Sequence, residues 1–182
     1  MTCHRRDPSP TATRPPARLV VFDFDGTLSW LRHGWPRIMT AVMRAHLPAR
    51  SGEDEAAVAA LLAGIVLGMN GHPTIMQMTR FAALVRERGG PVHAPEALRA
   101  EYQARLDAEI AARVARMRDG SAGTDAFVVC GARRLLERLA ASGAVLAVLS
   151  STVEERVREE AGVLGLTGYF AGRIHGLSLI HI

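Results

Sequence analysis

Hydrophobic residues follow two different periods along this chain. Apolar runs without alternation lie within 18–23 and 144–149, a pattern typical of strands covered on both faces of a parallel sheet. Elsewhere apolar residues recur every three or four positions, as on amphipathic helices. The pattern predicts helices over 34–47, 53–69, 74–88, 95–118, 131–142 and 151–164.

The order of these elements predicts an α/β fold with an inserted helical cap. Four predicted helices follow one another between the two apolar strands, with no strand signal among them. We therefore expect an α/β core over 18–32 and 120–176 and an all-helical cap over 33–119. Residues 1–17 are rich in Pro, Thr, Arg and Ser and predict a disordered leader.

Charge and cysteine content narrow the class of protein. The net charge is +4, and all 22 basic residues are Arg. Met1–Arg18 contributes four Arg against one Asp, so the rest of the chain is nearly neutral and does not predict a nucleic-acid surface. The two Cys are isolated, and neither an export signal nor a long apolar membrane span is visible. We expect a cytoplasmic protein with no membrane partner; nothing indicates its oligomeric state.

The strongest chemical signal is Asp23-x-Asp25-Gly26-Thr27, directly after the first apolar run. Ligands of parallel sheets bind at the carboxyl ends of strands, where this motif would lie. One carboxylate can attack phosphorus, while a second serves as general acid and then as base for water. Gly26 permits a turn that brings amides to phosphate oxygens, and Thr27 can orient the carboxylates. A β-hairpin turn at Asp25-Gly26 is the structural alternative.

Three further residues could contact a phosphate. Ser150 and Ser151 end the second apolar strand before the predicted helix, an arrangement that suits phosphate binding or simple helix capping. Arg32 could meet a substrate anion or be an ordinary solvated Arg.

The segment 20–28, V-V-F-D-F-D-G-T-L, closely resembles the first motif of the haloacid dehalogenase superfamily. The resemblance implies a Rossmann-like core, with Asp23 as nucleophile and Asp25 as general acid/base. It also implies Mg²⁺ bound by the Asp23 carboxylate and the Asp25 main-chain carbonyl. An acidic residue at Asp25 points to phosphatases and phosphomutases within the family. The Ser150 position resembles the second motif, and the cap resembles the C1 cap of phosphoglycolate-phosphatase-like members.

The chain departs from that family pattern in its later part. The family uses a Lys, sometimes an Arg, and a later acidic pair, but this chain has no Lys and no Asp or Glu after Glu160. About three core strands are expected, fewer than in an average sheet. The ending 177–182, L-S-L-I-H-I, resembles a translated sequencing-library adapter, so we expect a non-native tail on a C-terminally truncated chain.

These observations predict a Mg²⁺-dependent phosphatase that acts on a small phosphorylated metabolite through an aspartyl-phosphate. As an N-terminal fragment, the chain is expected to fold poorly and to lack turnover. Two alternatives stay open: a phosphomutase of the same superfamily, and a non-catalytic remnant that only binds phosphate.

Overall fold

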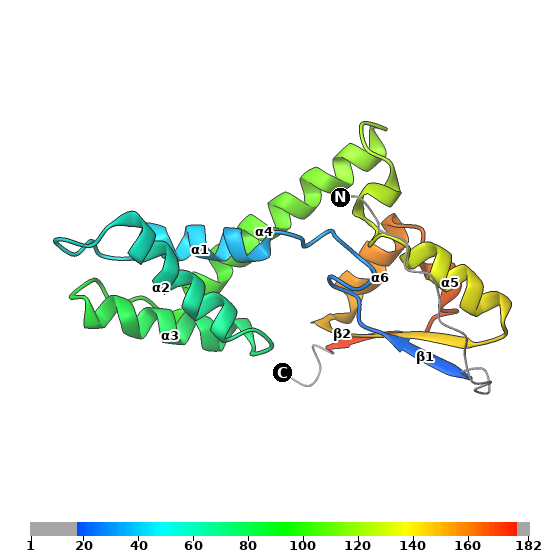
Figure 1. Cartoon of the computed structure of the whole chain (residues 1–182), viewed down its shortest axis with the longest axis horizontal. Coiled ribbons are helices and arrows are strands. Elements are labelled where there is room, and N and C mark those ends of the chain that lie inside the picture. Colours follow the sequence, from blue (N-terminus) through cyan, green and yellow to red (C-terminus); the bar gives the residue numbers. More distant parts are fainter. Residues whose placement is uncertain (1–17, 178–182) are drawn as a thin grey trace, which may run out of the picture. The chain divides into compact units, whose positions relative to one another are not determined.

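The computed structural model describes residues 18–177, so the predicted leader and residues 178–182 of the predicted tail lie outside the described part. The chain divides into two compact units. The core unit comprises the described residues of Met1–His33 and Arg113–Ile182, and the helical unit is Gly34–Ala112. Each unit is drawn in Figure 1. No helix in the described part is both long enough and apolar enough to cross a membrane.

The core unit contains a three-stranded parallel sheet, which confirms the predicted α/β class. The strands are β1 (Leu19–Phe22), β2 (Val145–Val153) and β3 (Ile174–Leu177), in the order β1-β2-β3. Phe22 lies opposite Val148 in the register, and Val148 lies opposite Ile174. Because β1 pairs in parallel with a distant strand, the hairpin alternative at Asp25-Gly26 is wrong.

The helices of the core unit cover one face of this sheet. They are α5 (Ala132–Ala141) and α6 (Glu154–Val163), with short 3₁₀ turns at Thr124–Phe127 (η1) and Thr167–Tyr169 (η2). Strands added successively in one direction with right-handed crossovers place their connecting helices on the same side. The buried core lies between sheet and helices and includes Phe22, Phe24, Leu136, Leu146, Val148, Val157, Phe170 and Ile174.

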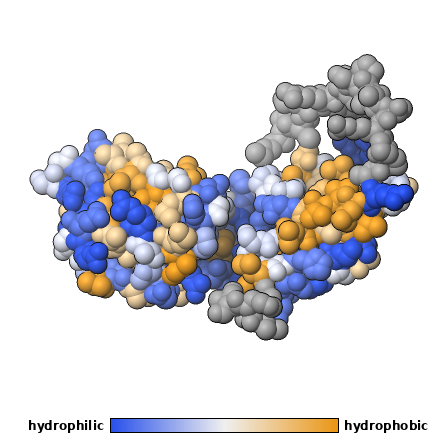
Figure 2. All heavy atoms as spheres, turned by 90° about the horizontal axis from the view of Figure 1, so that it is seen from below, coloured by the Kyte–Doolittle hydropathy of each residue, from blue (hydrophilic) through white to orange (hydrophobic). Residues whose placement is uncertain are grey.

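The opposite face of the sheet differs from the expectation of a strand covered on both sides. Leu19 and Val21 of β1 and Val145 and Leu149 of β2 share this face by alternation and register, and all four are exposed. Figure 2 shows apolar side chains gathered on this part of the surface. Within the described part of the core unit, α5 and α6 do not pack over them, because both helices lie on the other side.

The helical unit has a separate core. It contains α1 (Trp35–His46), α2 (Glu55–Gly68), α3 (Thr74–Glu87) and most of α4 (Pro95–Arg118). Helix α2 begins where Asp54 accepts a hydrogen bond from the Ala57 amide, 2.7 Å away. The buried residues of the unit include Met39, Val42, Met43, Leu62, Met78, Phe81, Val85 and Leu98. All four helices fall within two residues of their predicted ranges.

The largest difference from prediction is at the end of β2. The strand continues through Ser150, Ser151 and Thr152 to Val153, and α6 begins only at Glu154. The helix has Val153 as its N-cap and no side-chain cap. The expectation that α6 starts at Ser151 is therefore wrong. The β-branched pair Thr152-Val153 favours extended backbone, and Val153 pairs with Leu177 of β3.

Candidate active site

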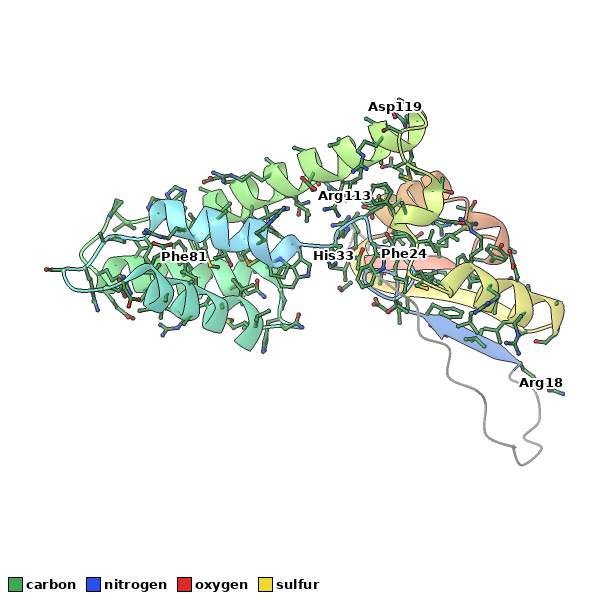
Figure 3. The ribbon with its side chains drawn as sticks, turned by 45° about the horizontal axis from the view of Figure 1, so that its top comes forward. Arg18, Phe24, His33, Phe81, Arg113 and Asp119 are labelled. Carbon is green, nitrogen blue, oxygen red and sulfur yellow. The ribbon has the colours of Figure 1, made fainter. Side chains whose placement is uncertain are left out.

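The turn after β1 presents the two Asp residues at the end of the sheet. The Phe24 carbonyl accepts hydrogen bonds from the amides of Thr27, Leu28 and Ser29, at 3.3, 2.9 and 3.0 Å. The chain can close this tightly because Gly26 has φ +78°, a conformation that favours glycine. The side chain of Phe24, which is labelled in Figure 3, is fully buried. The apolar anchor thus fixes the backbone that carries the carboxylates.

Asp23 is exposed, and a neighbouring hydroxyl orients it. Thr27 Oγ1 donates to Asp23 Oδ2 at 3.1 Å. This hydrogen bond is the orienting role that the sequence predicted for Thr27. An exposed carboxylate held in this way is accessible to a phosphate group and to a hard cation.

Asp25 lies in a more enclosed environment, with its side chain 28% exposed. Thr152 Oγ1 donates to Asp25 Oδ2 at 2.8 Å, and the Arg32 Nε lies 3.3 Å from Asp25 Oδ1. Burial raises the pKa of Asp25 above its ordinary value, and the nearby Asp23 raises it further. Arg32 and Thr152 act in the opposite sense. A carboxyl whose pKa is raised holds a proton more readily and is suited to donate one.

Arg32 forms ion pairs inside the core unit. The alternative that Arg32 is an ordinary solvated Arg is therefore wrong. Its side chain is 13% exposed, its Nη2 lies 2.6 Å from Glu160 Oε1, and its Nε lies 3.3 Å from Asp25 Oδ1. Its role as a direct contact of a substrate anion stays a prediction. Burial raises the pKa of Glu160, and the Arg32 charge partly offsets that effect.

The backbone leading to Arg32 is held from another element. Arg113, near the end of α4, donates through Nη1 to the carbonyls of Trp30 and Leu31, at 3.1 and 2.8 Å. The amide of Leu31 donates to the buried hydroxyl of Ser29 at 3.1 Å. Arg113 is labelled beside this segment in Figure 3. These contacts fix the segment from which the Arg32 side chain extends.

The two serines lie in the strand and not at a helix start. Ser150 is buried, and its Oγ accepts a hydrogen bond from the Thr152 amide at 3.1 Å. Ser151 is exposed. Neither residue lies at the α6 N-terminus, because β2 is longer than predicted. Their contacts with phosphate stay predictions.

Sequence reasoning missed two residues of this site, Thr152 and Glu160. A signal for Thr152 was present, since it is the last hydroxyl of the Ser-Ser-Thr run and lies two positions after Ser150. A signal for Glu160 was present as well. It lies three residues after Val157 and beside Ala161, on the buried stripe of α6, where a charged side chain needs a partner.

Metal-binding capacity in the described residues is limited to a few oxygen ligands. Within residues 18–177, no group of three or more His, Cys, Asp or Glu side chains is arranged to hold a metal ion. Asp23 supplies an accessible carboxylate, a hard ligand. Mg²⁺ is often bound by only one or two carboxylates together with water and substrate phosphate, so the donors present are compatible with it.

The chain belongs to the haloacid dehalogenase-like hydrolases, since the model of that family matches residues 17–179. Its fold and the position of the Asp23–Thr27 motif after β1 agree with this membership. No protein in the curated comparison matches the chain.

Solved structures share the fold at low sequence identity. A predicted phosphoglycolate phosphatase from Haemophilus somnus has a TM-score of 0.55 and 15% identity, over 88% of this chain and 62% of that one. A protein described as β-phosphoglucomutase from Thermotoga maritima has a TM-score of 0.54 and 16% identity, over 91% and 62%. A HAD family hydrolase from Deinococcus radiodurans, solved with bound phosphate and sodium, has a TM-score of 0.53 and 18% identity, over 88% and 58%. The chain spans less than two thirds of the length of each of these proteins.

Proposed function

We propose that this chain carries the nucleophile and the acid/base group of a Mg²⁺-dependent phosphatase for a small phosphorylated metabolite. The observation that supports this most is the contrast between the two Asp residues. Asp23 is exposed and oriented by Thr27, whereas Asp25 is enclosed by Thr152 and Arg32 with its pKa raised. Two carboxyl groups in such different environments can divide nucleophilic and proton-transfer roles.

In this proposal Asp23 attacks the phosphorus atom and forms an aspartyl-phosphate. Asp25, protonated at the start, gives its proton to the leaving oxygen. The resulting carboxylate then takes a proton from the water that hydrolyses the intermediate. Gly26 and Thr27 contact the phosphate from the turn, and Ser150 and Ser151 from β2. Mg²⁺, held by the Asp23 carboxylate and the Asp25 main-chain carbonyl, would supply charge neutralisation at the phosphate.

The substrate class and cellular location belong to the same proposal. The H. somnus protein of the same fold carries the name of a phosphatase for a small phosphorylated acid. A phosphomutase is the second candidate, because the T. maritima protein has a similar fold and such chemistry uses the same carboxylates. Detection of phosphate transferred to an added sugar phosphate, rather than released to water, would favour the phosphomutase. A cytoplasmic location remains part of the proposal.

We also propose that the 182-residue chain does not turn over by itself. It contains no Lys that could steady the aspartyl-phosphate, and its sheet has one apolar face exposed. A chain that binds phosphate but does not hydrolyse phosphate esters would be the non-catalytic remnant described above. Binding and turnover therefore need separate measurements.

The test uses beryllium trifluoride, which mimics a phosphoryl group bonded to a carboxylate. We expect the chain to bind it in the presence of Mg²⁺, as followed by ¹⁹F NMR, and Asp23→Asn to abolish the bound signal. Hydrolysis of p-nitrophenyl phosphate should stay at the level of Asp23→Asn. Equal binding by Asp23→Asn would refute the nucleophile assignment, and robust Mg²⁺-dependent hydrolysis would refute the lack of turnover.

A further inference from the structure

Glu160 is a buried carboxylate that the proposed phosphatase chemistry does not use. It lies on α6 with its side chain 9% exposed, and its Oε1 is 2.6 Å from Arg32 Nη2. Its other oxygen, Oε2, is buried and has no hydrogen-bond partner within residues 18–177. Its neighbours on the helix, Val157 and Ala161, belong to the apolar core.

Stability does not explain a charged pair at this position. A buried ion pair is often no more stabilising than well-packed apolar residues of similar size, because both charges must leave water. An apolar side chain at position 160 would continue the stripe formed by Val157, Ala161 and Leu164. The packing of α6 alone therefore does not account for the Arg32–Glu160 pair.

The geometry around Arg32 indicates a second role for the Arg32–Glu160 pair. One side of its guanidinium group is fixed by Glu160, and its Nε lies 3.3 Å from Asp25 Oδ1, an ion pair without a hydrogen bond. The other oxygen of Asp25 accepts the hydrogen bond from Thr152. We propose that Glu160 is a positioning residue, which through Arg32 fixes the side chain of Asp25 for proton transfer. This proposal rests on the acid/base role of Asp25 given above.

The same contacts favour a role of Arg32 beside Asp25 over its predicted contact with a substrate anion. Its positive charge is already paired with Glu160 at 2.6 Å, so less of it remains to attract a phosphate. Arg113 holds the carbonyls of Trp30 and Leu31, which limits how far Arg32 can swing away from this position. Arg32 thus joins the turn after β1 to α6.

Two metal-fluoride probes separate the position of Asp25 from that of Asp23. Beryllium trifluoride bonds to the Asp23 carboxylate and reports on the nucleophile. Tetrafluoroaluminate mimics the phosphoryl group in transfer, with an axial water that faces the acid/base carboxylate. In the full 182-residue chain with Mg²⁺, Glu160→Gln should weaken tetrafluoroaluminate binding by about tenfold, since small misplacements of a catalytic group are costly. Its affinity for beryllium trifluoride should change less than about twofold, because Asp23 is not displaced.

The matched control is a second, partly buried Arg–carboxylate pair. Arg88 in the helical unit is 3% exposed and lies 2.6 Å from Glu53. Glu53→Gln removes a similar charge, yet it should leave the affinities for both probes unchanged. Equal losses in both variants would attribute the effect to the loss of any Arg–carboxylate pair, and not to the position of Glu160.

A double-mutant cycle shows whether Glu160 acts through Arg32. In an Arg32→Ala background, Glu160→Gln should cause no further loss of tetrafluoroaluminate affinity. Arg32→Lys, which keeps the charge but loses the two-sided contact, reports on the same link if Glu160→Gln does not fold. Unchanged tetrafluoroaluminate affinity in Glu160→Gln or Arg32→Lys, or additive losses in the cycle, would overturn the proposal. A wild-type chain that binds neither probe would overturn the phosphatase proposal together with this one.

Discussion

The hydroxyl of Thr152 links β2 to the proposed acid/base group, and its removal should shift the titration of Asp25. Thr152 donates to Asp25 Oδ2 at 2.8 Å and thereby lowers the pKa of that carboxyl against the larger effect of burial. In Thr152→Val the pKa should rise further above the ordinary value of 3.8. Carboxyl ¹³C NMR during a pH titration measures the change directly.

The pH dependence of the free energy of unfolding follows from the same raised pKa of Asp25. A carboxyl with a raised pKa binds more protons in the folded state, so its favourable contribution is present at low pH. That contribution is lost as the pH rises through the raised pKa. Thr152→Val should extend this loss to higher pH. The control is Thr79→Val, which removes an exposed hydroxyl of α3 that donates to the Ile75 carbonyl. Equal Asp25 midpoints in wild type and Thr152→Val would contradict the assigned hydrogen bond.

Individual site residues could be predicted from sequence where their chemistry is local. The spacing of Asp23, Gly26 and Thr27 along the chain was sufficient to predict the turn and the orienting hydroxyl. Glu160 lies 128 positions from Arg32, so their contact depends on how α6 packs against the turn after β1. A local pattern indicates only that such a buried charge needs a partner, and the folded chain determines which one.

At the scale of elements, the connection between α3 and α4 depends on a residue without a side chain. A Cβ atom added at Gly90 would lie 2.5 Å from Pro48 Cγ and 2.7 Å from Val85 Cγ1. Neither the proline ring nor the β-branched Val85 can rotate away freely. We expect Gly90→Ala to lower the free energy of unfolding of the helical unit by about 1–3 kcal/mol. Urea denaturation followed by helical circular dichroism measures this.

Substitution of Gly64, in the same helical unit, should have the opposite effect on stability. Gly64 lies inside α2, is exposed, and would place an added Cβ within 4 Å of no other group. Gly64→Ala should raise the free energy of unfolding by about 0.5–1 kcal/mol, because Ala restricts the unfolded chain and favours the helix. A stability of Gly90→Ala equal to that of wild type would show that the connection can relax.

Helices of this chain could be predicted more closely than the end of β2. Helical periodicity over many residues fixed α4 as Pro95–Arg118, as expected. The Ser-Ser-Thr run is compatible with a helix cap and with extended backbone. Pairing of Val153 with Leu177 in β3, a long-range contact, favours the strand.

At the scale of the whole molecule, the exposed face of the sheet should dominate solution behaviour. Leu149 is 62% and Leu19 is 58% exposed, beside Val21 and Val145, and β1 is an edge strand of the described sheet. Contiguous apolar surface and an unpaired strand edge both promote association between chains. We therefore expect the chain to self-associate as its concentration rises, and Leu149→Lys to reduce this by placing a charge within the patch. Sedimentation velocity over a concentration series measures the effect.

Leu67→Lys is the matched control, since Leu67 of α2 is 59% exposed but lies in the helical unit. Equal reduction by both variants would attribute the association to general hydrophobicity, and no reduction in Leu149→Lys would exclude the sheet face as its cause.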